Sequence, residues 1–148
     1  MKRLVSVCSV LAIILSLAVP AFASEQETLV SQEVIVLEDG ITITDELYEI
    51  SVARSSNKEY VRQKTIKSNG TTIGIIAIKG KFSYNGTTVS VVSKSVTQTD
   101  TYNGWSYKQN SFTSSGGTIT LDAKLTKLLV PSVDFTITLS CDKNGNIS

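Results

Sequence analysis

Carboxylates and cysteine are the candidate catalytic groups in this sequence, because its 148 residues contain no histidine. Imidazole is the usual general base near neutral pH, a frequent zinc ligand and the partner of serine or cysteine nucleophiles, so its absence excludes those sites. Two carboxylate pairs, Asp45 with Glu46 and Asp122 with Asp134, could act as acid and base on a sugar. Asp122 and Asp134 fall on the polar sides of expected strands, in a domain small for an enclosed sugar site. We therefore predict no catalytic residues and no enzyme activity.

The last residues, "CDKNGNIS", offer little further chemistry. Cys141 shares its phase with Ile137 and Leu139, so we expect a buried thiol rather than a nucleophile. Asp142 and Asn144 resemble the opening of a calcium loop, but the other oxygen ligands and the terminal glutamate of such a loop are missing. We predict no metal site and no cofactor.

Aromatic residues around the Asn103-Gly104 turn are the best candidates for binding. In "TDTYNGWSYKQNSF", Tyr102, Trp105 and Tyr107, together with Lys108, could stack on sugar rings or anchor a protein contact. The alternative is that Trp105 closes one end of the core. These four residues form the candidate ligand-binding site.

The first residues are typical of a secretory signal peptide. Lys2 and Arg3 precede an apolar run, and the pattern Ala21-Phe22-Ala23 indicates cleavage before Ser24. We expect a signal-peptide helix over 1–23 and a single domain over 24–148, exported from a bacterial cell; a retained anchor is the alternative. The later sequence has no spanning segment, so we expect no membrane contact after cleavage.

The charges exclude one large class of partner. Without Lys2 and Arg3 the chain has 12 basic and 13 acidic side chains, which gives no electrostatic reason to bind nucleic acid. The N-terminal segment 24–49 contains acidic side chains and no basic one. It is either an arm for a basic partner or, as we favour, a solvated segment leading into a first hairpin.

Turn signals and alternation predict an all-β fold. Asn-Gly and Asp-Gly pairs recur between extended runs, and Asn85-Gly86 is expected to serve as a turn rather than as a glycan site, although Thr87 completes the glycosylation pattern. "GTITLDAKLT" and "VDFTITLSC" alternate apolar and polar residues. A bulge near Gly74, or burial of both faces there, would reconcile the isoleucines of "TTIGIIAIKG", and Pro131 indicates a longer connection or an edge. We predict an antiparallel immunoglobulin-like or related β-sandwich of about seven or eight strands.

"KGKFSYNGTTVSVVSKSV", the tryptophan of "NGWSYKQ" and "TITLSCDKNGNIS" together resemble a group of short proteins exported by Gram-positive, Clostridia-like bacteria. The resemblance covers most of residues 79–148 and implies a secreted protein of a group with no assigned activity. Relatives often have a second cysteine near the position of Val91. The resemblance therefore implies that Val91 and Cys141 face each other.

Export, the lack of histidine and the aromatic loop favour a non-catalytic binding or interaction module that acts outside the cell on a surface glycan or protein. The alternative is a structural protein that assembles through its edge strands, whose threonine-rich polar faces and few charges would permit pairing.

Overall fold

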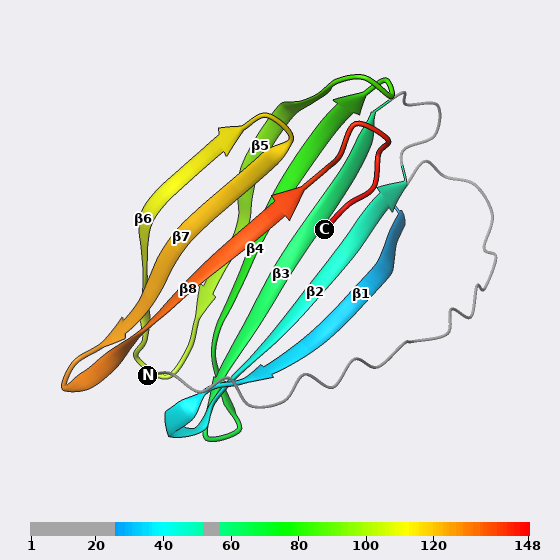
Figure 1. Cartoon of the computed structure of the whole chain (residues 1–148). Coiled ribbons are helices and arrows are strands. Elements are labelled where there is room, and N and C mark those ends of the chain that lie inside the picture. Colours follow the sequence, from blue (N-terminus) through cyan, green and yellow to red (C-terminus); the bar gives the residue numbers. More distant parts are fainter. Residues whose placement is uncertain (1–25, 52–56) are drawn as a thin grey trace.

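The computed structural model of the chain describes residues 26–51 and 57–148, and over these residues the chain is almost entirely β-strand (Figure 1). The predicted signal peptide and the first two residues of the expected domain lie outside the described residues. Eight antiparallel strands form two sheets, one of five strands in the order β1-β2-β3-β4-β5 and one of three in the order β6-β7-β8. Their bounds are β1 Gln26–Val36, β2 Ile41–Ser51, β3 Lys58–Ser68, β4 Thr71–Tyr84, β5 Val89–Thr101, β6 Ser106–Ser115, β7 Thr118–Lys127 and β8 Val130–Ser140.

The two sheets pack face to face as a sandwich, which confirms the predicted fold class. β8 packs over β3, β7 over β4, and β6 over β5. β1 and β2 therefore extend beyond the three-stranded sheet. Each sheet is a simple meander, so the connectivity is that of a related sandwich and not the Greek-key order of immunoglobulin domains.

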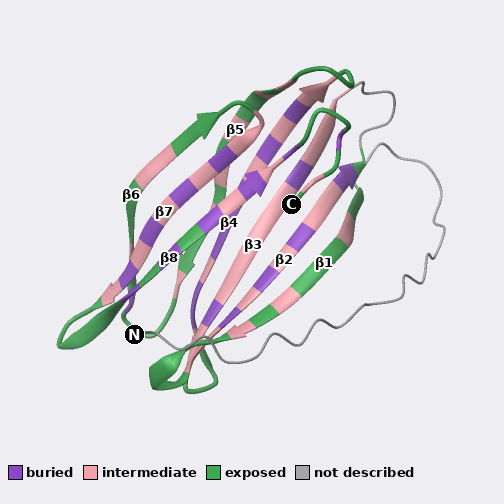
Figure 2. Ribbon diagram, in the orientation of Figure 1, coloured by how far each residue is buried: buried purple, intermediate pink, exposed green. Residues whose placement is uncertain are grey.

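Alternation in β7 and β8 produces one side of the core, as the sequence predicts. The inward-facing residues of both strands are buried, while their neighbours in sequence are half-buried or exposed (Figure 2). Period-two alternation places every second side chain against the other sheet, where apolar area is removed from water. The inward residues are Ile119, Leu121, Ala123 and Leu125 of β7, and Val133, Phe135, Ile137 and Leu139 of β8.

The central strand β4 lies close to the opposite sheet at two glycines. A Cβ on Gly74 would come within 2.6 Å of a Leu125 methyl, and one on Gly80 within 2.6 Å of an Ile119 methyl. The register between β3 and β4 also shifts next to Gly74, which makes Ile73 the extra residue of a bulge. The predicted bulge is thereby confirmed, and it turns Ile73 into the same core as Ile76.

All four edge strands contain an irregularity that disfavours pairing with another chain. The register shifts make Val30 the extra residue in β1 and Asn110 the extra residue in β6, with further shifts in β5 and at Pro131 in β8. Pro131 thus lies on an edge strand, one of its two predicted outcomes. Side chains also cover edge carbonyls: Arg62 Nη1 donates to Thr138 O (2.7 Å) and Lys94 Nζ to Phe112 O (2.9 Å).

The turns follow the predicted chemistry. The Asn85 side-chain oxygen accepts hydrogen bonds from the Thr87 and Thr88 amides (3.0 and 2.8 Å), and Gly86 has a φ of 83°. The amide side chain of Asn85 is thus engaged in the turn. The acidic segment, from Gln26 onward, forms the β1–β2 hairpin rather than a segment that precedes one.

Four connections meet at the end of the sandwich that is lowest in Figure 1, which we call the lower end. They are the β1–β2, β3–β4, β5–β6 and β7–β8 connections, and hydrogen bonds link the first three. Asn69 N donates to Gly40 O (2.9 Å), and Tyr102 N donates to Ile73 O (3.1 Å). These three connections are therefore tied together, and the β7–β8 connection lies beside them at the same end.

Candidate functional site

The four residues predicted as a binding site do not form one patch. Tyr102 is 42% exposed at the lower end, whereas Trp105 is only 8% exposed and belongs to the core. Tyr107 is half-buried and packs against the core, and burial raises the pKa of its phenol. Lys108 is exposed and, as the next residue on β6, lies on the opposite face of the strand.

Backbone geometry explains the position of Trp105. Asn103 and Gly104 both have positive φ (56° and 77°), and Trp105 N donates to Tyr102 O at 3.1 Å, which closes a tight turn. The turn carries the chain from one sheet to the other and directs the indole between them. The indole is buried between the sheets, so the alternative stated from the sequence, a core role for Trp105, is the one observed.

Tyr102 forms one wall of an open hollow at the lower end. The hollow has a volume of about 450 Å³ and is lined by Thr71, Thr72, Ile75, Tyr102 and Asn103. The Asn103 side chain donates to Thr72 O (3.1 Å), which fixes its amide at the rim. Tyr102 is thus the member of the predicted site that lines this hollow, and it does so from a turn rather than from a strand.

A second hollow, which we call the outer hollow, lies on the face of the five-stranded sheet that points away from the three-stranded sheet. Its volume is about 400 Å³, within the range of roughly 300–1,000 Å³ for ligand pockets. Ile50 and Ala77 are buried at its base without joining the core between the sheets. All five strands contribute to its lining, through Glu27, Tyr48, Ile50, Val61, Gln63, Ala77, Lys79, Thr97 and Gln98.

The Glu46 carboxylate organises the polar side chains beside the outer hollow. It accepts hydrogen bonds from Gln32 Nε2 (2.9 Å) and Gln63 Nε2 (3.1 Å). Burial, followed by the charge of Glu46 and a hydrogen bond to it, raises the pKa of the Tyr48 phenol. The Tyr48 phenol is therefore neutral and can donate a hydrogen bond, and Tyr48 and Gln63 line the same hollow.

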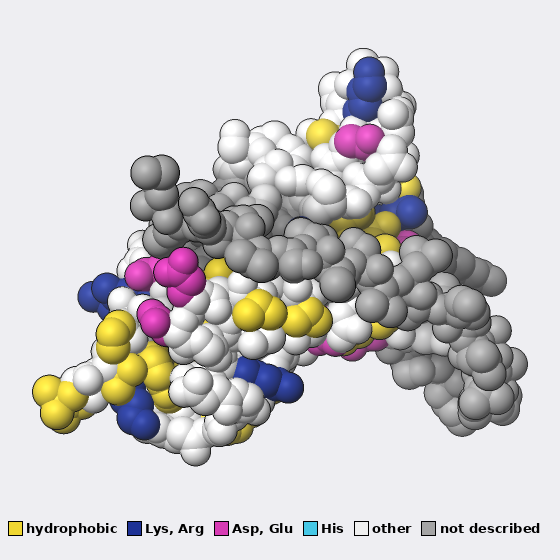
Figure 3. Space-filling view, turned by 60° about the horizontal axis from the view of Figure 1, so that its bottom comes forward, with side chains coloured by type: hydrophobic (Ala, Val, Ile, Leu, Met, Phe, Trp, Pro, Cys, Tyr) yellow, Lys and Arg dark blue, Asp and Glu magenta, His cyan; other side chains and the backbone are white. Residues whose placement is uncertain are grey.

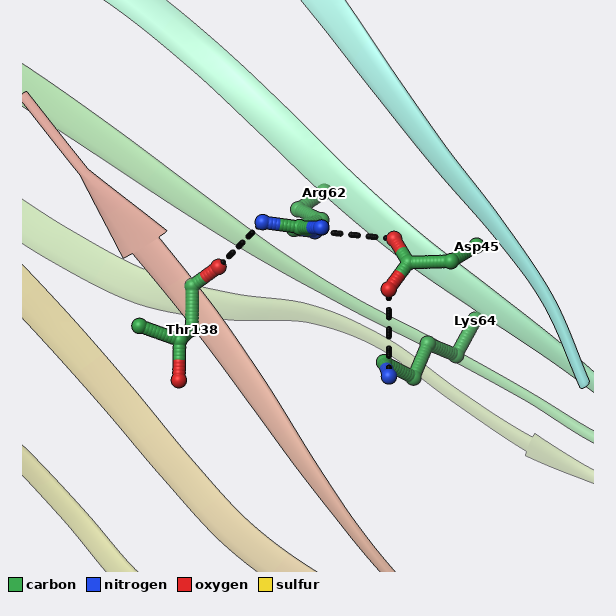
Figure 4. A network of polar contacts seen from close by, with 4 residues as sticks. All are labelled: Asp45, Arg62, Lys64 and Thr138. Atoms are coloured by element: carbon green, nitrogen blue, oxygen red, sulfur yellow. Dashed lines mark hydrogen bonds and ion pairs between the residues drawn. The ribbon is translucent and has the colours of Figure 1, made fainter. Parts of the chain in front are cut away.

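Asp45, the residue before Glu46, points to the opposite face and is 6% exposed. Its carboxylate contacts Arg62 Nε (2.8 Å) and Lys64 Nζ (3.1 Å), and Arg62 continues to Thr138 O on β8 (Figure 4). These contacts join β2 and β3 to the edge of the other sheet. They hold the sandwich closed where β8 ends the three-stranded sheet.

The carboxylate pairs predicted as possible acids and bases each lack a shared site. Asp45 and Glu46 lie on opposite faces of β2. Asp122 accepts from Ser111 Oγ (3.0 Å) and Thr136 Oγ1 (2.7 Å), while Asp134 has its own partner, Ser132 Oγ (3.4 Å). Asp45 and Glu46 therefore cannot face one cleft, and Asp122 and Asp134 are each held by neighbouring hydroxyl groups on β6 and β8.

The C-terminal residues form a turn. Cys141 is buried as predicted, and burial raises the pKa of its thiol, which disfavours a reactive thiolate. The Asp142 carboxylate accepts from Asn144 N and Asn146 N (both 2.8 Å) and from Asn146 Nδ2 (2.7 Å), and these bonds lower its pKa. In the described part of the chain, Cys, Asp and Glu form no group of three placed to hold a metal ion.

The residues of the outer hollow were not predicted from the sequence. One signal was present: Tyr48, Ile50 and Val61 are large apolar or aromatic residues on positions that alternate with the core residues. A strand that packs on the core with one face only should have polar residues on its other face. The positions were nevertheless scattered over separate strands, whose order the sequence did not reveal.

The fold and this surface define an eight-stranded antiparallel β-sandwich with a preformed polar hollow on its larger sheet. No protein-family model, no curated protein and no solved structure matches the chain. Within residues 26–51 and 57–148, there is no helix of the length and apolar character that crossing a bilayer requires.

Proposed function

We propose that this protein is an exported, non-catalytic binding module, and that its ligand is a neutral glycan held in the outer hollow. The observation that carries the proposal is a hollow of about 400 Å³ whose lining combines the Tyr48 ring with the Gln63 amide, which is itself held by Glu46. Export is proposed from the signal-peptide pattern of residues 1–23, and with it a ligand outside the cell.

The chemistry of the lining fits a polyhydroxyl ligand. A sugar presents C–H groups that pack on an aromatic ring, and hydroxyls that pair with amides able both to donate and to accept. Gln63 and Gln98 supply two such amides on β3 and β5, on either side of β4.

The charges at the outer hollow favour a neutral glycan over a charged one. Lys79, the basic residue of the lining, forms an ion pair with Glu59, whereas Glu27 in the lining and Glu46 beside it are acidic. An anionic glycan would be repelled by these carboxylates and would have to compete with Glu59 for Lys79, whereas neutral hydroxyls can donate to them. The hollow is also open to solvent, so a longer chain can continue beyond it.

Co-sedimentation with insoluble polysaccharides, including cell wall and mucin, tests the proposal. We expect one neutral polymer to deplete the protein from solution, and Tyr48→Ala to weaken that binding about 30-fold, as for an aromatic hot spot. Tyr102→Ala is the matched control, because it removes the exposed tyrosine of the other hollow. Failure of every polymer to bind, or unchanged binding by Tyr48→Ala, contradicts the proposal; loss only in Tyr102→Ala moves the site to the lower end.

Self-assembly through edge strands is the alternative function, and it draws less support from the geometry. Strand addition needs a regular row of free backbone groups, whereas bulges, Pro131, Arg62 and Lys94 interrupt the edges. Sedimentation velocity separates the two functions, since assembly requires oligomers at micromolar concentration and a binding module does not.

A further inference from the structure

The exposed hydrophobic side chains gather at the lower end. Of the nine large hydrophobic residues exposed in the described part of the chain, six lie on its connections or beside them. Figure 3, which turns this end toward the viewer, shows hydrophobic side chains at the outermost point on the left and others across the same side. The six residues are Val36, Leu37, Tyr102, Leu128, Leu129 and Val130.

The β7–β8 hairpin tip is the most exposed part of this surface. Leu128 is 85% exposed and Leu129 97%, and Val130, at 43%, continues the apolar stretch. Leu129 has a φ of 62°, a conformation in which asparagine or glycine is usual and leucine is strained. The turn itself therefore does not require these leucines, and two leucines exposed to this extent indicate an apolar contact.

In contrast to the sequence-based expectation of no membrane contact, which considered only spanning segments, we propose that the lower end docks on the surface of a zwitterionic lipid bilayer, with Leu128 and Leu129 inserted among the lipids. The leucines form a convex tip, while Val36 and Leu37 lie at the β1–β2 connection and Tyr102 at the β5–β6 connection. Apolar residues spread over three connections suit a fluid surface better than one rigid protein pocket. Tyr102 has the ring and hydroxyl of a residue that settles at a membrane interface.

The charges at the lower end select the kind of lipid. Lys127 is exposed directly before the tip and can meet a lipid phosphate. Glu38 and Asp39, on the exposed β1–β2 connection, would be repelled by an anionic surface. Insertion is thus driven by the leucines and not by net positive charge, so binding should depend little on salt.

Vesicle flotation with phosphatidylcholine tests the proposal. The full chain and the chain from Ser24 onward are compared, so that binding through the apolar N-terminal segment is separated from binding through the lower end. We expect both to float. In the chain from Ser24, Leu128→Ser combined with Leu129→Asn should lower the vesicle partition coefficient at least tenfold, because each buried leucine contributes about that factor. Asparagine tolerates the positive φ at position 129, so the variant should fold.

Val92→Ser is the matched control, since Val92 is 52% exposed near the opposite end of β5 and should not affect flotation. A Leu128→Trp variant adds a direct readout: its fluorescence should shift to the blue on vesicles and be quenched by brominated lipid. Trp105 is buried and constant as background. Absence of flotation from Ser24 onward, equal flotation of the leucine variant, or lipid-free oligomers that the leucine variant abolishes would each overturn the proposal.

Discussion

Asp45 and Glu46 are neighbours on β2, and their carboxylates meet opposite surroundings on the two faces of the same sheet. Inside, Asp45 is bound by two cations, Arg62 and Lys64, and is 6% exposed. Outside, Glu46 accepts hydrogen bonds from the neutral amides of Gln32 and Gln63. Both carboxylates are well satisfied, yet one closes the sandwich and the other organises an open surface.

The partners and the access to water explain this difference. A buried carboxylate loses its hydration and needs opposite charge close by, which consumes all of its bonding capacity. A carboxylate at the surface is held by neutral donors, whose other hydrogen-bonding atoms stay available to a ligand. The inner face of the sheet thus provides stability, and the proposed recognition belongs to the outer face.

Replacing Asp45 and Glu46, one at a time, by the corresponding amide tests this comparison. It gives the largest expected change in stability. Asp45→Asn should lower the free energy of unfolding by about 3 kcal/mol, because Arg62 and Lys64 lose their counter-charge. This is the lower end of the range for a broken buried pair, since the Arg62 side chain is 23% exposed. Glu46→Gln should cost less than about 1 kcal/mol. Urea unfolding of both variants measures the difference, and equal losses would show that the two faces do not differ.

A smaller loss of stability is expected from a substitution at Gly80, where the two sheets approach closely. A methyl group at Gly80 would meet Ile119 at 2.6 Å and Leu139 at 3.0 Å, so Gly80→Ala should destabilise the fold by about 1–3 kcal/mol through overpacking. Ser95→Ala, an exposed change on the outer face of β5, should stay within about 0.5 kcal/mol. Thermal unfolding compares the two; a Gly80→Ala protein as stable as the wild type would mean that the sheets can move apart.

The sequence was sufficient for the fold class because alternation and turn chemistry are local. Ile119 to Leu125 and Val133 to Cys141 show their buried phase directly, and Asn85-Gly86 shows its turn. The strand order could not be predicted, since pairing depends on contacts between distant residues. The offset that leaves β1 and β2 beyond the three-stranded sheet was hidden for the same reason.

The site was less predictable than the fold. The aromatic cluster around Trp105 is contiguous in sequence, but period-two alternation and the turn at Asn103 separate its members into core, half-buried and exposed positions. Conversely, Tyr48, Gln63 and Gln98 come together only through strand pairing. Leu128 and Leu129 continue an apolar run that looks like a strand, and only the position of the turn exposes them.

The smallest expected effect is a change in the pKa of Tyr48, which reports on the outer face of the five-stranded sheet alone. Its raised pKa means that the neutral phenol stabilises the fold below the pKa of an unfolded tyrosine, and that this contribution is lost as the pH rises through the folded pKa. Glu46→Gln removes the negative charge and weakens the acceptor, so the pKa should fall toward its ordinary value without reaching it, because burial remains. Tyr107 is the internal control, since burial alone raises its pKa. NMR titration of ring-labelled tyrosines follows both. An unchanged Tyr48 pKa in Glu46→Gln would show that Glu46 does not act on the phenol, and would contradict its role in organising the outer face.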